Sequence, residues 1–125
     1  MSLQMLFAIA SIAAYFGVDA VVVRGRTMPA RQAIHAIGKK ETVCGVVTHI
    51  QHALNNHVQP TLVSLGQPNR KYAFEIAITG SDLPRFDPGP DAWNGRRICV
   101  RGRIRFYAGH PIIIALNPNQ VSLGR

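Results

Sequence analysis

The sequence predicts an all-β fold, a small barrel of five strands preceded by one short helix. Five segments rich in β-branched residues are separated by turn residues. The third connection is long and irregular, and a tight turn at residues 108–110 joins the last two segments. Gly45 and Gly102 each interrupt a strand, as expected where long strands coil around a narrow barrel. A chain of 125 residues is long enough for one such domain.

The N-terminal segment 1–20 is predicted to be a secretory signal peptide. Residues 1–18 contain no charged side chain, and Val18-Asp19-Ala20 resembles a signal-peptidase site. A single membrane anchor and a buried N-terminal helix are the alternatives. Cleavage would leave an exported protein, periplasmic or extracellular, with no stable membrane span. An uncleaved chain would instead be cytoplasmic.

Residues 21–38 are predicted to form a lead-in and a short helix over Met28–Ile37, ahead of a barrel domain at 39–125. Pro29 suits a first helical turn, and Gly38 is a plausible stop. The apolar stripe of this helix would consist of Ala30, Ala33, Ile34 and Ile37.

The five strands are expected in order along the barrel domain, at Glu41–Leu54, Thr61–Leu65, Lys71–Ile78, Arg97–Tyr107 and Pro111–Leu116. Gly45 predicts a bulge or a bend in the first strand. Turns are expected at 55–57 and 67–69, and a Pro- and Gly-rich loop with one helical turn at 79–95. Trp93 in that loop is expected to plug one end of the barrel. A short tail begins at Gln120.

The fourth strand has two contrasting faces, because side chains on a strand alternate. One face is apolar and comprises Ile98, Val100, Gly102, Ile104 and Phe106. The opposite one, termed the arginine face, comprises Arg97, Cys99, Arg101, Arg103, Arg105 and Tyr107. A row of like charges needs an anionic partner or abundant water. The net charge of +8 and the pI of about 10.5 also favour a polyanion.

The two cysteines, Cys44 and Cys99, leave two states open. An exported chain permits a disulfide between them, whereas a cytosolic chain favours free thiols. Cys99 lies on the arginine face, so a cross-strand bridge on the barrel exterior is one of the two possibilities.

Short motifs between Ile34 and Val121 resemble a family of small bacterial OB-fold proteins described as nucleic-acid-binding and often exported or lipid-anchored. The matching motifs are Ile37-Gly38-Lys39, Val43-Cys44-Gly45-x-Val47, Pro60 to Gly66, Gly95-x-x-Ile98-Cys99-Val100-x-Gly102-x-Ile104, Tyr107-x-Gly109-x-Pro111-x-Ile113 and Pro118-x-Gln120-Val121. The resemblance implies a five-stranded Greek-key OB-fold barrel. No cysteine near residue 20 offers a lipid acceptor, which departs from the lipid-anchored members.

OB-folds usually bind ligands across their second and third strands and the flanking loops. Single-stranded nucleic acid requires cations for phosphate and flat rings for stacking. The candidate nucleic-acid-binding residues are Arg70, Lys71, Arg97, Arg101, Arg103, Arg105 and Tyr107. By alternation, the three rings of Tyr72, Phe74 and Phe106 are expected in the core.

The sequence therefore predicts non-catalytic binding of single-stranded nucleic acid or another polyanion. A merely solvated arginine face remains the competing interpretation of the row. The alternative function is an exported structural or interaction module of the cell envelope, with a protein, peptide or glycan partner. Oligomeric state cannot be inferred from the pattern.

Enzymatic and metal sites are disfavoured by spacing. His49 and His52 point to opposite faces of a strand, and His57 has no supporting ligand nearby. Asp82, Asp87 and Asp91 do not converge in pattern, and neither Ser64 nor Ser81 lies in a triad signature. We therefore predict no enzyme activity, no metal and no cofactor.

Overall fold

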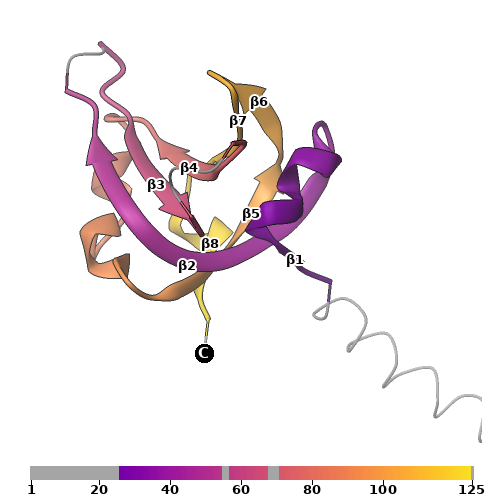
Figure 1. Ribbon diagram of the computed structural model, residues 1–125. Coiled ribbons are helices and arrows are strands. Elements are labelled where there is room, and N and C mark those ends of the chain that lie inside the picture. The colour runs from indigo at the N-terminus through magenta and orange to yellow at the C-terminus, as the bar shows by residue number, and fades with distance from the viewer. Residues whose placement is uncertain (1–25, 55–56, 68–70, 125) are drawn as a thin grey trace, which may run out of the picture.

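The computed structural model describes residues 26–54, 57–67 and 71–124 (Figure 1). The predicted signal peptide, the tips of the two predicted turns and the candidate residue Arg70 lie outside these residues. The described chain is mostly β, with 46% of residues in strands and 18% in helices. None of its helices is long and apolar enough to cross a membrane.

One eight-stranded sheet forms the molecule. Its strands are β1 (Met28–Pro29), β2 (Lys40–His52), β3 (Thr61–Leu65), β4 (Phe74–Ile78), β5 (Arg97–Arg103), β6 (Arg105–Tyr107), β7 (His110–Ile114) and β8 (Val121–Leu123). They are hydrogen-bonded in the order β6-β7-β4-β3-β2-β5-β8, and β1 pairs with β2. The sheet is open at β6 and β8, so a closed barrel is not confirmed.

Strand β2 is long and curved, and it pairs with different strands at its two ends (Figure 1). Lys40–Val46 pairs antiparallel with β5, and Val47–His52 pairs antiparallel with β3. The register shifts between Val47 and His49, so the bulge lies at Thr48. The bulge predicted at Gly45 therefore lies three residues later, at Thr48.

The N-terminal helix differs from the one predicted over Met28–Ile37. Met28 and Pro29 instead form β1, because Pro29 is extended with a φ of −70° and a ψ of 153°. A 3₁₀ helix, η1, follows over Ala30–Ala36. Its buried residues, Ala30, Ala33 and Ala36, recur every three positions, which is the period of a 3₁₀ helix. Ile37, expected in the apolar stripe, is 41% exposed.

The core lies between the inner faces of the strands. Fully buried members include Val43, Val47, Val63, Leu65, Phe74, Ile76, Ile78, Ile98, Val100, Ile104 and Ile113. In the loop predicted at 79–95, two short 3₁₀ helices form, η2 (Leu83–Arg85) and η3 (Pro90–Trp93). Trp93 is buried edge-on against Phe86, with ring centroids 6.0 Å apart.

The C-terminal tail is more ordered than predicted, because it contributes η4 (Pro118–Gln120) and β8. Strand β8 pairs antiparallel with β5. The Gln120 side chain holds the segment in place: its Oε1 accepts a hydrogen bond from the Leu116 N–H at 2.7 Å, and its Nε2 donates to the Arg101 carbonyl at 2.9 Å.

The predicted fourth strand is divided at Ile104 into β5 and β6. The Ile104 N–H donates to the Lys39 carbonyl, and its carbonyl accepts from the Gly38 N–H. After Ile104 the chain leaves β2 and pairs with β7. Strand β6 is an edge strand on which Arg105, Phe106 and Tyr107 are all exposed, so alternation no longer separates a buried face from an exposed one.

Candidate functional site

The arginine face lies in solvent along β5 and β6. Arg97, Arg101 and Arg103 are exposed on β5, and Arg105 and Tyr107 are exposed on β6. The residues of β2 opposite the three β5 arginines are Val46, Thr42 and Lys40. No carboxylate therefore neutralises these arginines across the strand pair.

The arginines differ in how firmly the fold holds them. Arg103 Nη1 donates a hydrogen bond of 2.6 Å to the Gly38 carbonyl, so this side chain also ties β5 to the start of β2. Within the described residues, the other arginines of the face form no salt bridge with an acidic side chain. Their guanidinium groups are available to an anion.

A disulfide joins Cys44 of β2 to Cys99 of β5, which are direct partners across the two strands. The sequence left bonded and free thiols open, and the structure contains the bond. It lies on the same side of β5 as the arginines, because Cys99 alternates with Arg97 and Arg101.

Exposed rings gather at the start of β4 and along β6. The Tyr72 and Phe106 rings have centroids 6.2 Å apart and planes tilted by 57°. The side chains of Tyr72, Phe106 and Tyr107 are 39%, 50% and 67% exposed. Lys71 Nζ lies 5.1 Å from the centroid of the Tyr72 ring, a cation–π distance.

This cluster corrects the sequence prediction, because of the three rings assigned to the core only Phe74 is buried. Tyr72 precedes β4 in a turn with a φ of +62°, so the strand alternation does not reach it. Phe106 follows the change of partner at Ile104. Both rings are partly exposed, where Tyr107 alone was expected to be.

A cleft of about 650 Å³ lies next to the rings. It is bounded by η1, the middle of β2, the end of β3 and the segment preceding β4. Among the described residues, three cationic side chains line it, namely Arg31, Lys71 and Arg97, and no carboxylate does. We call this hollow the basic cleft. Tyr72 lines it too, so one ring belongs both to the ring pair and to the cleft wall.

Glycine at position 45 lets the walls of the basic cleft approach one another. A Cβ at Gly45 would lie 3.1 Å from the Leu65 Cβ and 3.4 Å from the Ala30 Cβ. Gly66, at the end of β3, has a φ of +82°, which glycine adopts without strain. The strand glycine noted in the sequence thus positions η1 against β2 and β3.

The structure unites two of the seven candidate residues in the basic cleft, Lys71 and Arg97. Arg101, Arg103, Arg105 and Tyr107 remain on the open arginine face. The sequence did not single out Arg31, because it lies on the polar side of a predicted helix with no motif around it. In the sequence, the only feature that marked Arg31 was its place two residues after Pro29, on the polar side of the predicted helix.

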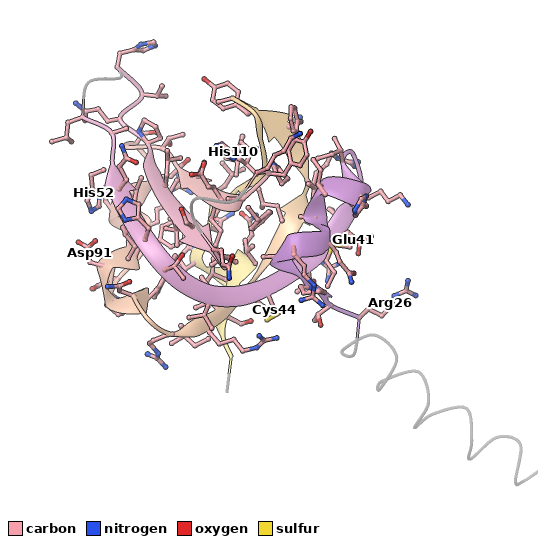
Figure 2. All side chains as sticks on the ribbon, viewed as in Figure 1. Arg26, Glu41, Cys44, His52, Asp91 and His110 are labelled. Atoms are coloured by element: carbon pink, nitrogen blue, oxygen red, sulfur yellow. A yellow bond between two sulfur atoms is a disulfide. The ribbon has the colours of Figure 1, made fainter. Side chains whose placement is uncertain are left out.

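A second polar cluster lies at the far end of β2. His52 Nδ1 is 2.9 Å from Thr61 Oγ1, and His52 Nε2 is 3.0 Å from Asp91 Oδ1 (Figure 2). Threonine, histidine and aspartate are the residue types of a nucleophilic triad. However, Thr61 is only 1% exposed, so a substrate cannot reach its hydroxyl. The cluster instead links β2, β3 and η3.

Neither the histidines nor the aspartates considered in the sequence converge on an ion-binding set. Among the described residues, no three His, Cys, Asp or Glu side chains gather closely enough to hold a metal. Asp82 accepts a hydrogen bond from the Thr79 hydroxyl at 3.0 Å and faces Arg85 at 3.7 Å. The carboxylates of Asp82 and Asp91 are thus engaged in local contacts.

Comparisons with known proteins inform the fold. No protein-family model and no curated protein matches the sequence. Among solved structures, a chain described as an aspartyl-tRNA synthetase from Leishmania major Friedlin is similar, with a TM-score of 0.52 and 8% sequence identity. The similarity covers 79% of this chain and 21% of that one. This protein thus spans about a fifth of the length of that chain, and at such identity the likeness concerns the fold alone.

Proposed function

We propose that this protein is a non-catalytic OB-fold protein that binds single-stranded nucleic acid. The observation that carries the proposal is the exposed Tyr72–Phe106 ring pair, with Lys71 over one ring and a carboxylate-free basic cleft beside it. Single strands are bound by cations that follow the phosphates and rings that stack on unpaired bases. Both kinds of group are exposed here on neighbouring elements.

The pairing of the long strands supports the OB-fold. Strands β5 and β6 are separated only by Ile104, and together they occupy the place of one kinked strand. Taken as one, they pair with β2 at one end and with β7 at the other, while β4 pairs parallel with β7. Five strands paired in this cycle would correspond to the Greek-key barrel that the sequence resemblance implies.

The close approach of β5 to β7 favours the same architecture. A Cβ at Gly102 of β5 would lie 2.7 Å from Cγ2 of Ile113 in β7. Such an approach is expected where neighbouring strands of a narrow barrel converge, since β6, the continuation of β5, pairs with β7. The structural relative is named for an enzyme that acts on tRNA, so RNA as well as DNA strands are suitable probes.

The proposal is tested with the full chain and a fluorescent oligothymidylate. We expect binding at about 20 mM salt that weakens at least tenfold at about 200 mM, since each phosphate contact contributes to the salt dependence. A duplex of the same length should bind less tightly, because its stacked bases cannot reach the rings. Absence of binding at low salt would refute the proposal.

A second candidate, an exported interaction module of the cell envelope, is favoured by the Cys44–Cys99 disulfide. Disulfides persist in oxidising compartments and are rare in the cytosol. Cell fractionation with N-terminal sequencing of the mature protein distinguishes the two candidates. A cleaved, exported, disulfide-bonded chain supports the envelope module, and an uncleaved cytosolic chain supports nucleic-acid binding.

A further inference from the structure

We propose that the basic cleft binds the phosphate monoester of a nucleotide, either at the phosphorylated end of a strand or in a free nucleotide. The strand-end form rests on the proposed function, and the free-nucleotide form does not. The cleft differs from the arginine face, because Arg101, Arg103 and Arg105 do not line it. The protein would then carry two anion-binding surfaces, which share Arg97.

The charge of the cleft fits a terminal phosphate. Arg31 comes from η1, Lys71 from the segment before β4 and Arg97 from β5, so three cations come from three separate segments. A phosphate monoester carries a charge of about −1.5 to −2 and three acceptor oxygens. An internal phosphodiester carries a single negative charge. The monoester therefore gains more from three cations that line one cleft and from arginine's paired donors.

The size of the cleft also suits a nucleotide. Its walls include η1, the middle of β2 and the end of β3. A volume of about 650 Å³ lies within the usual range of small-molecule sites.

The remaining wall chemistry suits a nucleoside next to that phosphate. Ala30, Ile34 and Leu65 provide an apolar surface inside the cleft. The Tyr72 ring lines the cleft and also contacts Phe106, so a base stacked on this ring would keep its own phosphate beside Lys71. The ring pair and the cleft would thus bind two parts of the same nucleotide.

The test compares three internally labelled oligothymidylates, which carry a 5′-phosphate, a 3′-phosphate or neither. We expect about tenfold tighter binding of one phosphorylated form. The preference should be lost in Arg31→Gln and in Arg97→Gln. It should persist in Arg96→Gln, the matched control, because exposed Arg96 is adjacent in the chain but does not line the cleft. Circular dichroism confirms that the variants are folded.

Calorimetry with thymidine 5′-monophosphate and with thymidine tests whether the cleft binds a free nucleotide. The free-nucleotide form is supported if thymidine 5′-monophosphate binds, thymidine does not, and the binding is lost in Arg97→Gln. If no oligonucleotide binds in addition, the proposed function fails and this inference stands. Equal binding of all three oligonucleotides, with no heat from the monophosphate, overturns the inference and leaves the proposed function intact.

Discussion

The Tyr72 ring lies against the Phe106 ring while its own backbone holds a φ of +62°. A non-glycine residue in this region costs about 1–3 kcal/mol when the surroundings hold it there. The ring remains 39% exposed, so complete burial of the side chain does not offset that cost. Retention of an exposed ring at a strained position agrees with a role in binding.

Replacement of this ring should separate stability from binding. In Tyr72→Asn, asparagine tolerates positive φ, so we expect the free energy of unfolding to stay within about 1 kcal/mol of the original. Loss of one stacking surface, worth about 1–3 kcal/mol per base, should weaken oligothymidylate binding by about 5- to 150-fold. Urea denaturation and fluorescence anisotropy measure the two quantities.

Leu116→Asn provides the matched control for that experiment, because Leu116 is 51% exposed and belongs neither to the ring pair nor to the lining of the basic cleft. It should bind oligothymidylate with unchanged affinity. Unchanged affinity in Tyr72→Asn as well would show that the ring does not stack on bases.

The arginine face should determine the salt dependence of binding. Arg101→Gln and Arg105→Gln each remove one exposed cation that lacks the structural hydrogen bond of Arg103. If each contacts one phosphate, the slope of log affinity against log salt should fall by about 0.7 per substitution on a single strand. Titrations at four salt concentrations give the slope.

The control for the slope is Arg85→Gln, because Arg85 lies in η2 and faces Asp82 at 3.7 Å. Its slope should equal that of the unmodified protein. Were Arg101→Gln and Arg105→Gln also to keep that slope, the row would be only a solvated outer face, the competing interpretation of the sequence.

The strand faces could be predicted from the sequence as long as each strand kept one partner. Ile98 and Val100 are buried between exposed Arg97 and Arg101, as alternation requires while β5 pairs with β2. At Ile104 the neighbouring strand changes from β2 to β7, and the alternation of side chains along a strand cannot predict such a change. Phe106 lies opposite buried Pro111, but it belongs to the edge strand β6 and is 50% exposed, so the predicted core position is wrong.

The basic cleft could not be predicted, because its residues meet only through the tertiary fold. Arg31 and Arg97 lie far apart in the sequence, and no motif connects them. The strand β8 was missed for a different reason: three residues are too few to show a periodicity, and Gln120 contributes through hydrogen bonds to a neighbouring strand. The mid-strand glycines do mark close approaches, of Gly45 to Leu65 and of Gly102 to Ile113.

Substitution of Gly102 directly tests the close approach of β5 to β7. A Cβ there would meet the Ile113 side chain at 2.7 Å, which is too close for an unshifted structure. Gly102→Ala should therefore lower the free energy of unfolding by about 1–3 kcal/mol, the usual cost of overpacking. Chemical denaturation measures the loss of unfolding free energy, and the midpoint of thermal unfolding should fall as well.

Gly89→Ala serves as the control, since a Cβ at Gly89 would meet the Phe86 carbonyl oxygen at an ordinary 3.7 Å. This substitution should be neutral or slightly stabilising, because alanine restricts the unfolded chain. Equal stability of the two variants would contradict the close approach of β5 and β7.

The Cys44–Cys99 bond should contribute strongly to stability, because it closes a loop with a sequence separation of 55. A cross-link of that span typically stabilises a domain by about 2–4 kcal/mol. The double variant Cys44→Ala/Cys99→Ala should therefore unfold at a lower urea concentration. Reduction of the unmodified protein with dithiothreitol should lower its midpoint similarly, while the double variant should not respond.

These two measurements separate the bond from the packing of the cysteine side chains. Cys44 is 3% exposed, so its replacement also removes buried atoms and adds to the loss in the variant. The shift caused by dithiothreitol in the unmodified protein reports the covalent link alone. A midpoint that does not respond to reduction would show that the bond adds nothing to the fold, and it would remove the main support for an oxidising compartment.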